Sequence, residues 1–389
     1  MFTSPFALST SRPGAGTIHL SLLAPATPSL RTLSYQYPLK LLGPTPLLLP
    51  TSTTTTSSTA RAHLVHTVFL LSYGGGLVAG DEITLRICVE ACTRLVLLTQ
   101  GSTKVFAGRD GDGGGGGSSQ QMSVRVERGG AWVCLTDPVQ VFAGSWFEQG
   151  VVCEVDGLVG GEGEGGVGAD GNGGADGVGE EEEAALCVLD WVCEGRRARG
   201  ESWLCRRYAS RNEIWLCSPP AAAGEDEGDD GVAEGLPRRK RRLLLRDNIV
   251  LDASTAAAPL ADRMDGLGVF GTLILHGALF SPLARFFLRE FSLLPRIGGR
   301  NWDSGSDDGG GGGGEAVVAD EEEVWRQARQ RQETVDGLIW TAADVRGCVV
   351  VKFGAREVEG AKRWLYLMLK KEGTCEREFG ERSLLCLKS

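Results

Sequence analysis

The chain has 389 residues, of which 56 are glycine and 42% are hydrophobic, and it carries a formal net charge of −10 at pH 7. This length allows one large β domain or two ordinary domains with a sizeable buried core. The negative charge argues against a general nucleic-acid-binding protein, which needs a basic surface to meet the phosphates. The chain shows no targeting peptide and no run of the roughly 18 apolar residues that a membrane helix needs, so we expect a soluble, cytoplasmic protein.

The first part of the chain is typical of short strands separated by turns. Residues 19–23 alternate weakly and indicate a first strand, and residues 40–50 form an extended segment that prolines hold. Residues 51–60 are rich in Ser and Thr, and we interpret them as a disordered insertion.

A glycine turn and a strictly alternating strand come next. Glycines 74–76 free the backbone from the limits that a Cβ imposes, and Gly80 and Asp81 close a second bend. From residue 82 to residue 90, apolar and polar side chains alternate with the period of a half-buried strand. Another strand starts at residues 95–98 and ends in a polar turn.

Two glycine patterns in this region formally match nucleotide sites. The spacing Gly74-x-Gly76-x-x-Ala79 matches the dinucleotide fingerprint, but a strand follows where the fingerprint needs a helix N-terminus for the pyrophosphate. The segment from Gly101 to Lys104 has the residue types of a phosphate loop but lacks its upstream glycine and its residue order. Both patterns are therefore interpreted as tight turns.

The remaining strands are interrupted by low-complexity tracts. We expect insertions, in which Gly, Asp and Glu dominate, at residues 108–120, 157–183, 221–236 and 301–323. Strand alternation resumes beyond residues 108–119, so that tract is interpreted as an enlarged hairpin tip. Residues 337–353 indicate two strands around a turn at Arg346 and Gly347.

Two stretches have helical periodicity. Ser281 and Pro282 suit the start of a helix, and apolar residues follow at i, i+3, i+4 and i+8. Residues 356–371 predict an amphipathic helix near the C-terminus. Because strands arrive at intervals of about ten residues and no βαβ alternation appears, the sequence predicts a mainly β fold with two helices.

The histidines and cysteines form no recognisable catalytic or metal motif. His63 and His66 would make a metal pair on a helix, but they start a strand, where residues three apart face opposite ways. His276 lies in an apolar strand and is interpreted as a hydrogen-bonded core residue. The eleven cysteines are an odd number in no framework spacing, so we expect buried thiols. The residues do not indicate an enzyme.

Polar side chains on turns or in apolar strands are the candidate site residues, namely Asp81, Gln100, Thr103, Lys104, Asp137, Asp190, Glu194 and Glu201. Buried carboxylates are costly unless they are paired or solvated. One interpretation pairs Asp190 or Glu201 with Arg196 or Arg197 in a structural ion pair. The other places several of these residues along a water-filled internal passage, where oxygen ligands hold a divalent ion weakly enough to release it.

The glycine turn, the alternating strand and the polar turn together resemble the signature of the urease accessory protein D family (UreD, also UreH). That family shows Gly-Gly-x-x-x-Gly-Asp, a spacer with one strand, and Thr-x-x-x-Thr-Lys-x-Tyr/Phe. The matching residues are Gly75, Gly76, Gly80, Asp81, Thr99, Thr103, Lys104 and Phe106. The run LDWVCEGRRARGESW resembles a second signature, in which Asp190 stands where many members have glutamate. The segment LTDPVQVFAGSWFEQ resembles a third, with Thr136 in place of the usual proline.

The resemblance covers nearly the whole chain outside the low-complexity tracts and is to a fungal-type member. It implies a stacked, β-helix-like, two-layer single domain over residues 17–372, followed by a C-terminal tail at 373–389. It also implies a non-catalytic urease maturation factor that binds apo-urease and the accessory proteins F and G, of which G is a GTPase.

The same resemblance implies that the protein helps to deliver nickel through an internal polar tunnel, without a tightly bound cofactor. The candidate residues of the nickel path are Asp81, Thr103, Lys104, Asp190 and Glu201. Two alternatives stay open: a hydrolase that uses His276 and nearby carboxylates, and a nuclear interaction protein that uses the basic run from Arg238 to Arg242. That run also fits basic residues that flank and protect an apolar strand.

Overall fold

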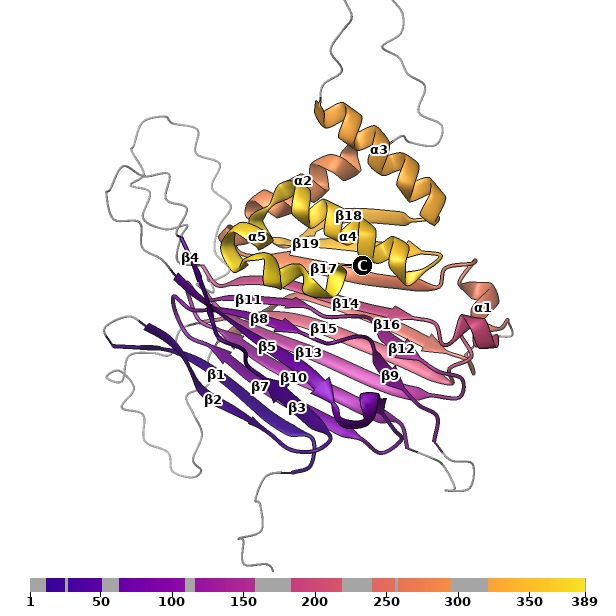
Figure 1. Cartoon of the computed structure of the whole chain (residues 1–389), viewed down its shortest axis with the longest axis horizontal. Coiled ribbons are helices and arrows are strands. Elements are labelled where there is room, and N and C mark those ends of the chain that lie inside the picture. The colour runs from indigo at the N-terminus through magenta and orange to yellow at the C-terminus, as the bar shows by residue number, and fades with distance from the viewer. Residues whose placement is uncertain are drawn as a thin grey trace, which may run out of the picture.

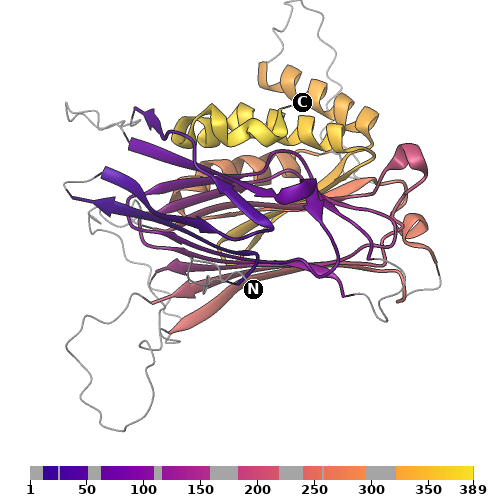
Figure 2. The same cartoon turned by 60° about the horizontal axis from the view of Figure 1, so that its bottom comes forward.

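The computed structural model describes residues 12–24, 27–50, 63–108, 116–157, 183–218, 240–255, 258–294 and 321–388. They form two stacked β-sheets, with helices over the outer face of one sheet (Figures 1 and 2). The prediction of a mainly β fold is confirmed. The tracts predicted as insertions at 51–60 and 221–236, and most of those at 157–183 and 301–323, lie outside the described residues.

Sheet A has seven strands in the order β16-β15-β13-β10-β7-β1-β2. Its inner strands run parallel, and an antiparallel pair closes each edge. The strands are β1 (Ala15–Leu23), β2 (Thr27–Tyr35), β7 (Glu82–Val89), β10 (Ser118–Val126), β13 (Trp146–Asp156), β15 (Arg207–Cys217) and β16 (Arg241–Asp252).

Sheet B has twelve strands, eight of them in the order β18-β19-β17-β14-β11-β8-β5-β3. These eight are β3 (Leu39–Leu42), β5 (His63–Ser72), β8 (Arg94–Leu98), β11 (Ala131–Leu135), β14 (Ala185–Cys193), β17 (Val269–His276), β18 (Ile339–Val345) and β19 (Cys348–Ala355). The four short strands beside this path are β4 (Leu47–Leu49), β6 (Gly76–Leu77), β9 (Thr103–Val105) and β12 (Val139–Val141).

In the middle of the chain, the long strands alternate between the two sheets. From β7 the chain crosses to β8, returns to β10, and continues through β11, β13, β14 and β15, while the short strands β9 and β12 stay in sheet B. Parallel neighbours need a long connection between them, and here the strand in the opposite sheet supplies it. The stacked, β-helix-like arrangement that the resemblance implies is thus present without βαβ units.

This winding corrects the interpretation of the glycine tract at 108–119 as a hairpin tip. β9 lies in sheet B, whereas β10 pairs in parallel with β7 and β13 of sheet A, so the two strands beside the tract are not partners. β10 also begins at Ser118, inside the range that the sequence assigns to an insertion. The alternation in sequence identifies strands but not their partners.

The packing confirms the alternating strand. Within β7, Ile83, Leu85, Ile87 and Val89 are buried in the core between the sheets, and the residues that alternate with them are exposed or half-buried. A second core lies between sheet B and the helices. Neither glycine pattern leads into a phosphate-binding helix, because β6 and β7 follow the first and β9 follows the second.

The helical content exceeds the sequence prediction. The two predicted helices are present as α2 (Ser281–Ser292) and α4 (Val358–Glu372). The structure adds α3 (Glu321–Asp336), α5 (Thr374–Phe379), the single turn α1 (Leu260–Arg263), and the 3-10 segments η1 (Tyr73–Gly75), η2 (Arg197–Arg199), η3 (Ala278–Phe280) and η4 (Glu381–Leu387). Among these helices, none is long and apolar enough to span a membrane.

The residues assigned to a C-terminal tail at 373–389 are part of the domain as far as residue 388. Cys375, Phe379, Leu384 and Leu387 are buried in the core under the helices. The short length of α5 and η4, six and seven residues, explains why periodicity does not find them.

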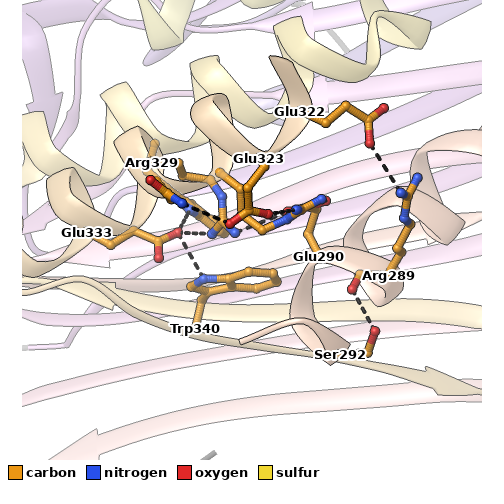
Figure 3. A network of polar contacts seen from close by, with 11 residues as sticks. Arg289, Glu290, Ser292, Glu322, Glu323, Arg329, Glu333 and Trp340 are labelled. Atoms are coloured by element: carbon orange, nitrogen blue, oxygen red, sulfur yellow. Dashed lines mark hydrogen bonds and ion pairs between the residues drawn. The ribbon is translucent and has the colours of Figure 1, made fainter. Parts of the chain in front are cut away.

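Helix α3 is held by a buried ion-pair network in place of an apolar face (Figure 3). Arg329 is 3% exposed, donates to Glu290 of α2 at 3.2 Å and pairs with Glu333 one turn further on. Glu333 also accepts the indole N–H groups of Trp340 at 3.1 Å and Trp364 at 2.8 Å. Because the contacts are polar, the sequence of α3 lacks the apolar stripe by which helices are recognised.

The thiols give a direct test of the packing. Nine of the eleven cysteines are buried, Cys88 is half-buried and Cys92 is exposed. Burial raises the pKa of the Cys193 and Cys386 thiols to about 12, which disfavours the reactive thiolate. Titration of the folded chain with a disulfide reagent should show one fast thiol, Cys92, and nine that react only after unfolding. A fast thiol that remains in Cys92→Ser would contradict this packing.

Candidate functional site

Polar side chains form a row across the strands, in the otherwise apolar space between the two sheets. On sheet A, strand register aligns Gln120 of β10 with Gln149 of β13, and Gln149 with Ser210 of β15. Asn212, two residues further along β15, lies beside Asp247 of β16.

Sheet B supplies the other side of the row. Asp190 of β14 is aligned with Thr272 of β17, and Thr272 with Lys352 of β19. Thr99 and Asp137 lie at the opposite end, after β8 and β11. We call this set the polar row: Thr99, Gln120, Asp137, Gln149, Asp190, Ser210, Asn212, Asp247 and Thr272.

Asp190 is the central carboxylate of the polar row and is 6% exposed. It accepts hydrogen bonds from Gln149 Nε2 at 2.6 Å, Ser210 Oγ at 2.5 Å and Asn212 Nδ2 at 2.5 Å, all from sheet A. Burial raises the pKa of the Asp190 carboxyl, these three donors oppose that rise, and the charge of Asp247 adds to it. The structure therefore holds this carboxylate in the interior with three neutral hydrogen-bond donors from the described strands.

A small inner cavity of about 40 Å³ adjoins Asp190. Its polar lining comes from Thr99, Thr103, Thr136, Gln120, Asp137, Gln149 and Asp190. Its volume is sufficient for a few water molecules, since one needs roughly 10–15 Å³. Within the described part of the chain, the Oε1 atom of Gln120, which lines the cavity, and the Oδ1 atom of Asn212 are buried acceptors without a hydrogen-bond donor. Such oxygens suit bound water or a weakly held cation.

Each end of the polar row carries a carboxylate paired with a lysine. Asp137 accepts from Thr99 Oγ1 at 3.0 Å and from Lys362 Nζ of α4 at 2.7 Å. Thr99 and Asp137 also line a surface pocket of about 750 Å³, here called the Lys362 pocket, so it adjoins the inner cavity. These shared residues connect the interior to the surface beside α4 and η4.

At the other end, Asp247 is the terminal carboxylate. It accepts from Thr272 Oγ1 at 3.0 Å and from Lys352 Nζ at 2.6 Å. The Lys352 side chain is 48% exposed and lines a second surface pocket of about 820 Å³, here called the Lys352 pocket. One end of the polar row thus lines the Lys362 pocket, and the other end is Asp247, whose lysine partner lines the Lys352 pocket.

The structure brings together two of the five candidate nickel-path residues. Thr103 and Asp190 both line the inner cavity. Asp81 instead accepts the backbone N–H of Val78 at 2.9 Å and closes its turn. Lys104 is exposed on β9, and the carboxylate of Glu201 pairs with an arginine on the surface. Sequence proximity to the signature motif therefore does not place a residue in the interior.

The ion-pair interpretation, which pairs Asp190 or Glu201 with Arg196 or Arg197, is confirmed through Glu201, which pairs with Arg196. Among the described residues, Asp190 instead accepts hydrogen bonds from three neutral side chains. Of the other polar candidates, Gln100 lines the Lys362 pocket, Asp137 belongs to the polar row, and Glu194 pairs with Arg197 at 2.6 Å.

The histidines are held by structural contacts. His63 contacts the backbone carbonyl of Glu378 at 3.1 Å, and His66 contacts that of Pro28 at 3.2 Å. Burial lowers the pKa of both rings. The Nδ1 atom of His276 lies 3.2 Å from the carbonyl oxygen of Gly347. Within the described ranges, no three His, Cys, Asp or Glu side chains are grouped as metal ligands.

Six members of the polar row and both lysines are not evident as site residues in the sequence, namely Gln120, Gln149, Ser210, Asn212, Asp247, Thr272, Lys352 and Lys362. A signal exists for two of them. Along β15, Tyr208, Ser210, Asn212 and Ile214 share the buried face, so two polar side chains interrupt an apolar phase. Polar residues at buried positions of an alternating strand need hydrogen-bond partners, so their presence in the sequence of β15 indicates a buried polar site.

The raised pKa of Asp190 predicts a pH dependence of stability. The Asp190 carboxyl binds a proton more tightly in the folded state than in the unfolded state, where its pKa is 3.8. This proton binding stabilises the fold at low pH, and the stabilisation is lost as the pH rises through the folded-state pKa. Asp190→Asn has no carboxyl to titrate and lacks this pH dependence. Its free energy of unfolding, relative to wild type, should therefore increase as the pH is raised from about 4 to 7.

The matched control has the opposite sign. Hydrogen bonds from Ser254 and Arg207 lower the pKa of the half-buried Asp252 to about 2. Asp252→Asn should lose stability relative to wild type as the pH rises from about 2 to 4. Urea unfolding at a series of pH values measures both slopes, and parallel curves for the two variants would contradict the assignment.

The fold and the polar row define a two-sheet β protein with a line of buried polar side chains across an apolar core, and comparison with known proteins gives its family. The model of the UreD urease accessory protein family matches residues 15–158 and 180–381. The chain is 27% identical to urease accessory protein 4 of Cryptococcus neoformans var. grubii, over 90% of this chain and 88% of that protein. It is 25% identical to an uncharacterized ureD-like urease accessory protein of Schizosaccharomyces pombe, over 85% and 84%.

A bacterial relative matches over a shorter stretch. The chain is 34% identical to urease accessory protein UreD of Sorangium cellulosum over 34% of this chain and 33% of that protein. The chain belongs to the UreD urease accessory protein family. Its role lies in urease maturation, as an accessory protein rather than an enzyme.

Proposed function

We propose that this chain binds apo-urease together with F-type and G-type accessory proteins, and that nickel passes along the polar row on its way to urease. The observation that carries the proposal is the row itself, since it crosses the core from the Lys362 pocket, which Thr99 and Asp137 line, to Asp247, whose partner Lys352 lines the other pocket. Buried polar groups, each of which needs a partner, do not make a core more stable than apolar side chains would. Transport of an ion through the interior would explain why this core contains them.

The chemistry of the row suits a cargo ion. Its ligands are carboxylate, hydroxyl and amide oxygens, led by Asp137, Asp190 and Asp247, and oxygen donors bind divalent nickel less firmly than imidazole or thiolate. The inner cavity of about 40 Å³ leaves room for an ion with only part of its water shell. Ligand exchange along the row would then replace the water that the ion loses.

Exposed apolar side chains border both pockets and support partner binding there. Leu42 and Leu385, at the Lys362 pocket, are 42% and 44% exposed, and Ile339, at the Lys352 pocket, is 62% exposed. Apolar groups gathered at a pocket mouth are typical of protein interaction sites. We assign the two pockets to the two sides of the complex, urease and the accessory proteins, through which nickel would enter and leave.

The test is urease maturation in cells that lack this protein. Urease protein should be present at its normal level but with little nickel and little activity, and re-expression of this chain should restore both. Full nickel content and activity in the deletion strain would overturn the proposal. The nuclear hypothesis stays a prediction: Arg238 and Arg239 lie outside the described residues, and Arg241 and Arg242 start β16.

A further inference from the structure

Both terminal carboxylates of the polar row are occupied by a lysine ammonium from outside the row. We propose that Lys362 and Lys352 are gates: a divalent cation enters or leaves the row only when it displaces one of these ammonium groups from Asp137 or Asp247. This inference rests on the proposed function, because it assigns the control of the same passage.

The geometry at the Lys362 end places the ammonium at the junction of two spaces. Asp137 lines both the inner cavity and the Lys362 pocket, and its side chain is 5% exposed. One oxygen accepts from Thr99 and from the backbone N–H of Gly101, and the other accepts from Lys362. A cation that comes from the pocket therefore meets a carboxylate whose second oxygen is already paired with the Lys362 ammonium.

Exchange of one cation for another keeps the buried charge balanced at every step. A bare carboxylate in the interior is costly, so Asp137 and Asp247 need a cation whenever the passage is empty. A lysine ammonium is a compact charge on a flexible stem, which can swing into the adjoining pocket when a metal ion replaces it. An arginine would hold the carboxylate in a rigid two-point contact and would release it less readily.

The two gates differ in burial, which predicts that one end of the row opens more readily than the other. The Lys362 side chain is 16% exposed and that of Lys352 is 48% exposed. The ammonium that is more exposed costs less to detach, so the Asp247 end should open first. A partner that docks an acidic side chain in either pocket would draw the lysine outward and open that end.

The experiment measures nickel binding to the purified full-length chain, with nickel chloride alone as the probe and calorimetry or equilibrium dialysis as the readout. Lys362→Met removes the ammonium and frees Asp137, so this variant should bind about one more nickel ion per chain than wild type, or bind it at least tenfold more tightly. Lys362→Met with Asp137→Asn should lose this gain. Acidic tracts elsewhere bind equally in all variants and cancel in the comparison.

The matched control is Lys370→Met, on the same helix, which removes an exposed lysine paired with Glu376. It should bind nickel as wild type does. Lys352→Met repeats the test at the exposed end and serves in place of Lys362→Met if circular dichroism shows that the latter does not fold. If the folded lysine variants bind nickel with the same stoichiometry and affinity as wild type, the proposal that Lys362 and Lys352 are gates is wrong.

This outcome is separate from that of the proposed function. The binding measurement uses no urease, so a gain in Lys362→Met supports the gates even if urease matures normally without the polar row. Conversely, unchanged binding in the lysine variants removes the gates, while loss of maturation in a polar-row variant would still support the route.

Discussion

Replacing Asp190 by asparagine is expected to lower the nickel content and activity of urease by about 10- to 100-fold in cells that depend on this chain. Asp190 is the one carboxylate at the centre of the polar row, and its oxygens face Gln149, Ser210 and Asn212. The amide keeps the size of the side chain but removes its charge. It also sets an NH2 group against donors from sheet A, so the row loses the acceptor that would hold a passing cation.

The measurement is urease activity and bound nickel in a deletion strain complemented with each variant, with the level of both proteins determined alongside. Asp252→Asn is the control, because it removes a surface carboxylate that pairs with Arg207 at 2.6 Å, outside the row. It should activate urease as wild type does. Normal activation by a folded Asp190→Asn chain would remove the polar row from the nickel route.

Replacing Arg329 by methionine is expected to lower the free energy of unfolding by about 3–5 kcal/mol. Arg329 is buried between α2 and α3, where it holds Glu290 and Glu333 and lies over the rings of Trp325 and Trp340. Without its charge, two carboxylates stay in the second core with fewer donors. Methionine fills part of the space, so the loss reports mainly the broken ion pairs.

The control for this variant lies in the same two helices (Figure 3). Arg289 of α2 pairs with Glu322 of α3 at 3.2 Å, with side chains that are 63% and 50% exposed. Arg289→Ala should change the free energy of unfolding by only about 0–1 kcal/mol, since solvent screens an exposed pair. Urea denaturation measures the free energy of unfolding of both variants. Equal losses would show that burial of Arg329 does not determine how much it stabilises the fold.

Part of the fold follows from local sequence patterns. The alternation from Glu82 to Val89 predicts a strand with one buried face, and the structure has that strand and that face. The apolar spacing in α2 and α4 predicts their helices. By contrast, α3 docks through Arg329 and Glu333, and a helix whose buried contacts are ion pairs carries no apolar period that would reveal them.

The candidate site shows the same division. Asp190 is visible in the sequence because a charged residue interrupts an apolar run, and a buried charge needs an explanation. Its partners come from β13 and β15, which are separated from it in the chain by turns and low-complexity tracts. Glu201 is closer to Asp190 in sequence yet pairs with Arg196 at the surface. Distance along the chain therefore gives no guide to membership of the row.

Residue types a few positions apart are enough to predict the strand-rich class, the two amphipathic helices and the motif that indicates the family. Which strands pair, and which polar groups meet, follows from the folded chain alone. The long strands from β7 to β15 alternate between the two sheets, so the residues of the polar row are brought together by register between strands far apart in sequence. Register is a property of the whole stack: a shift by one residue would turn Asp190 away from Ser210 and Asn212 and towards the second core.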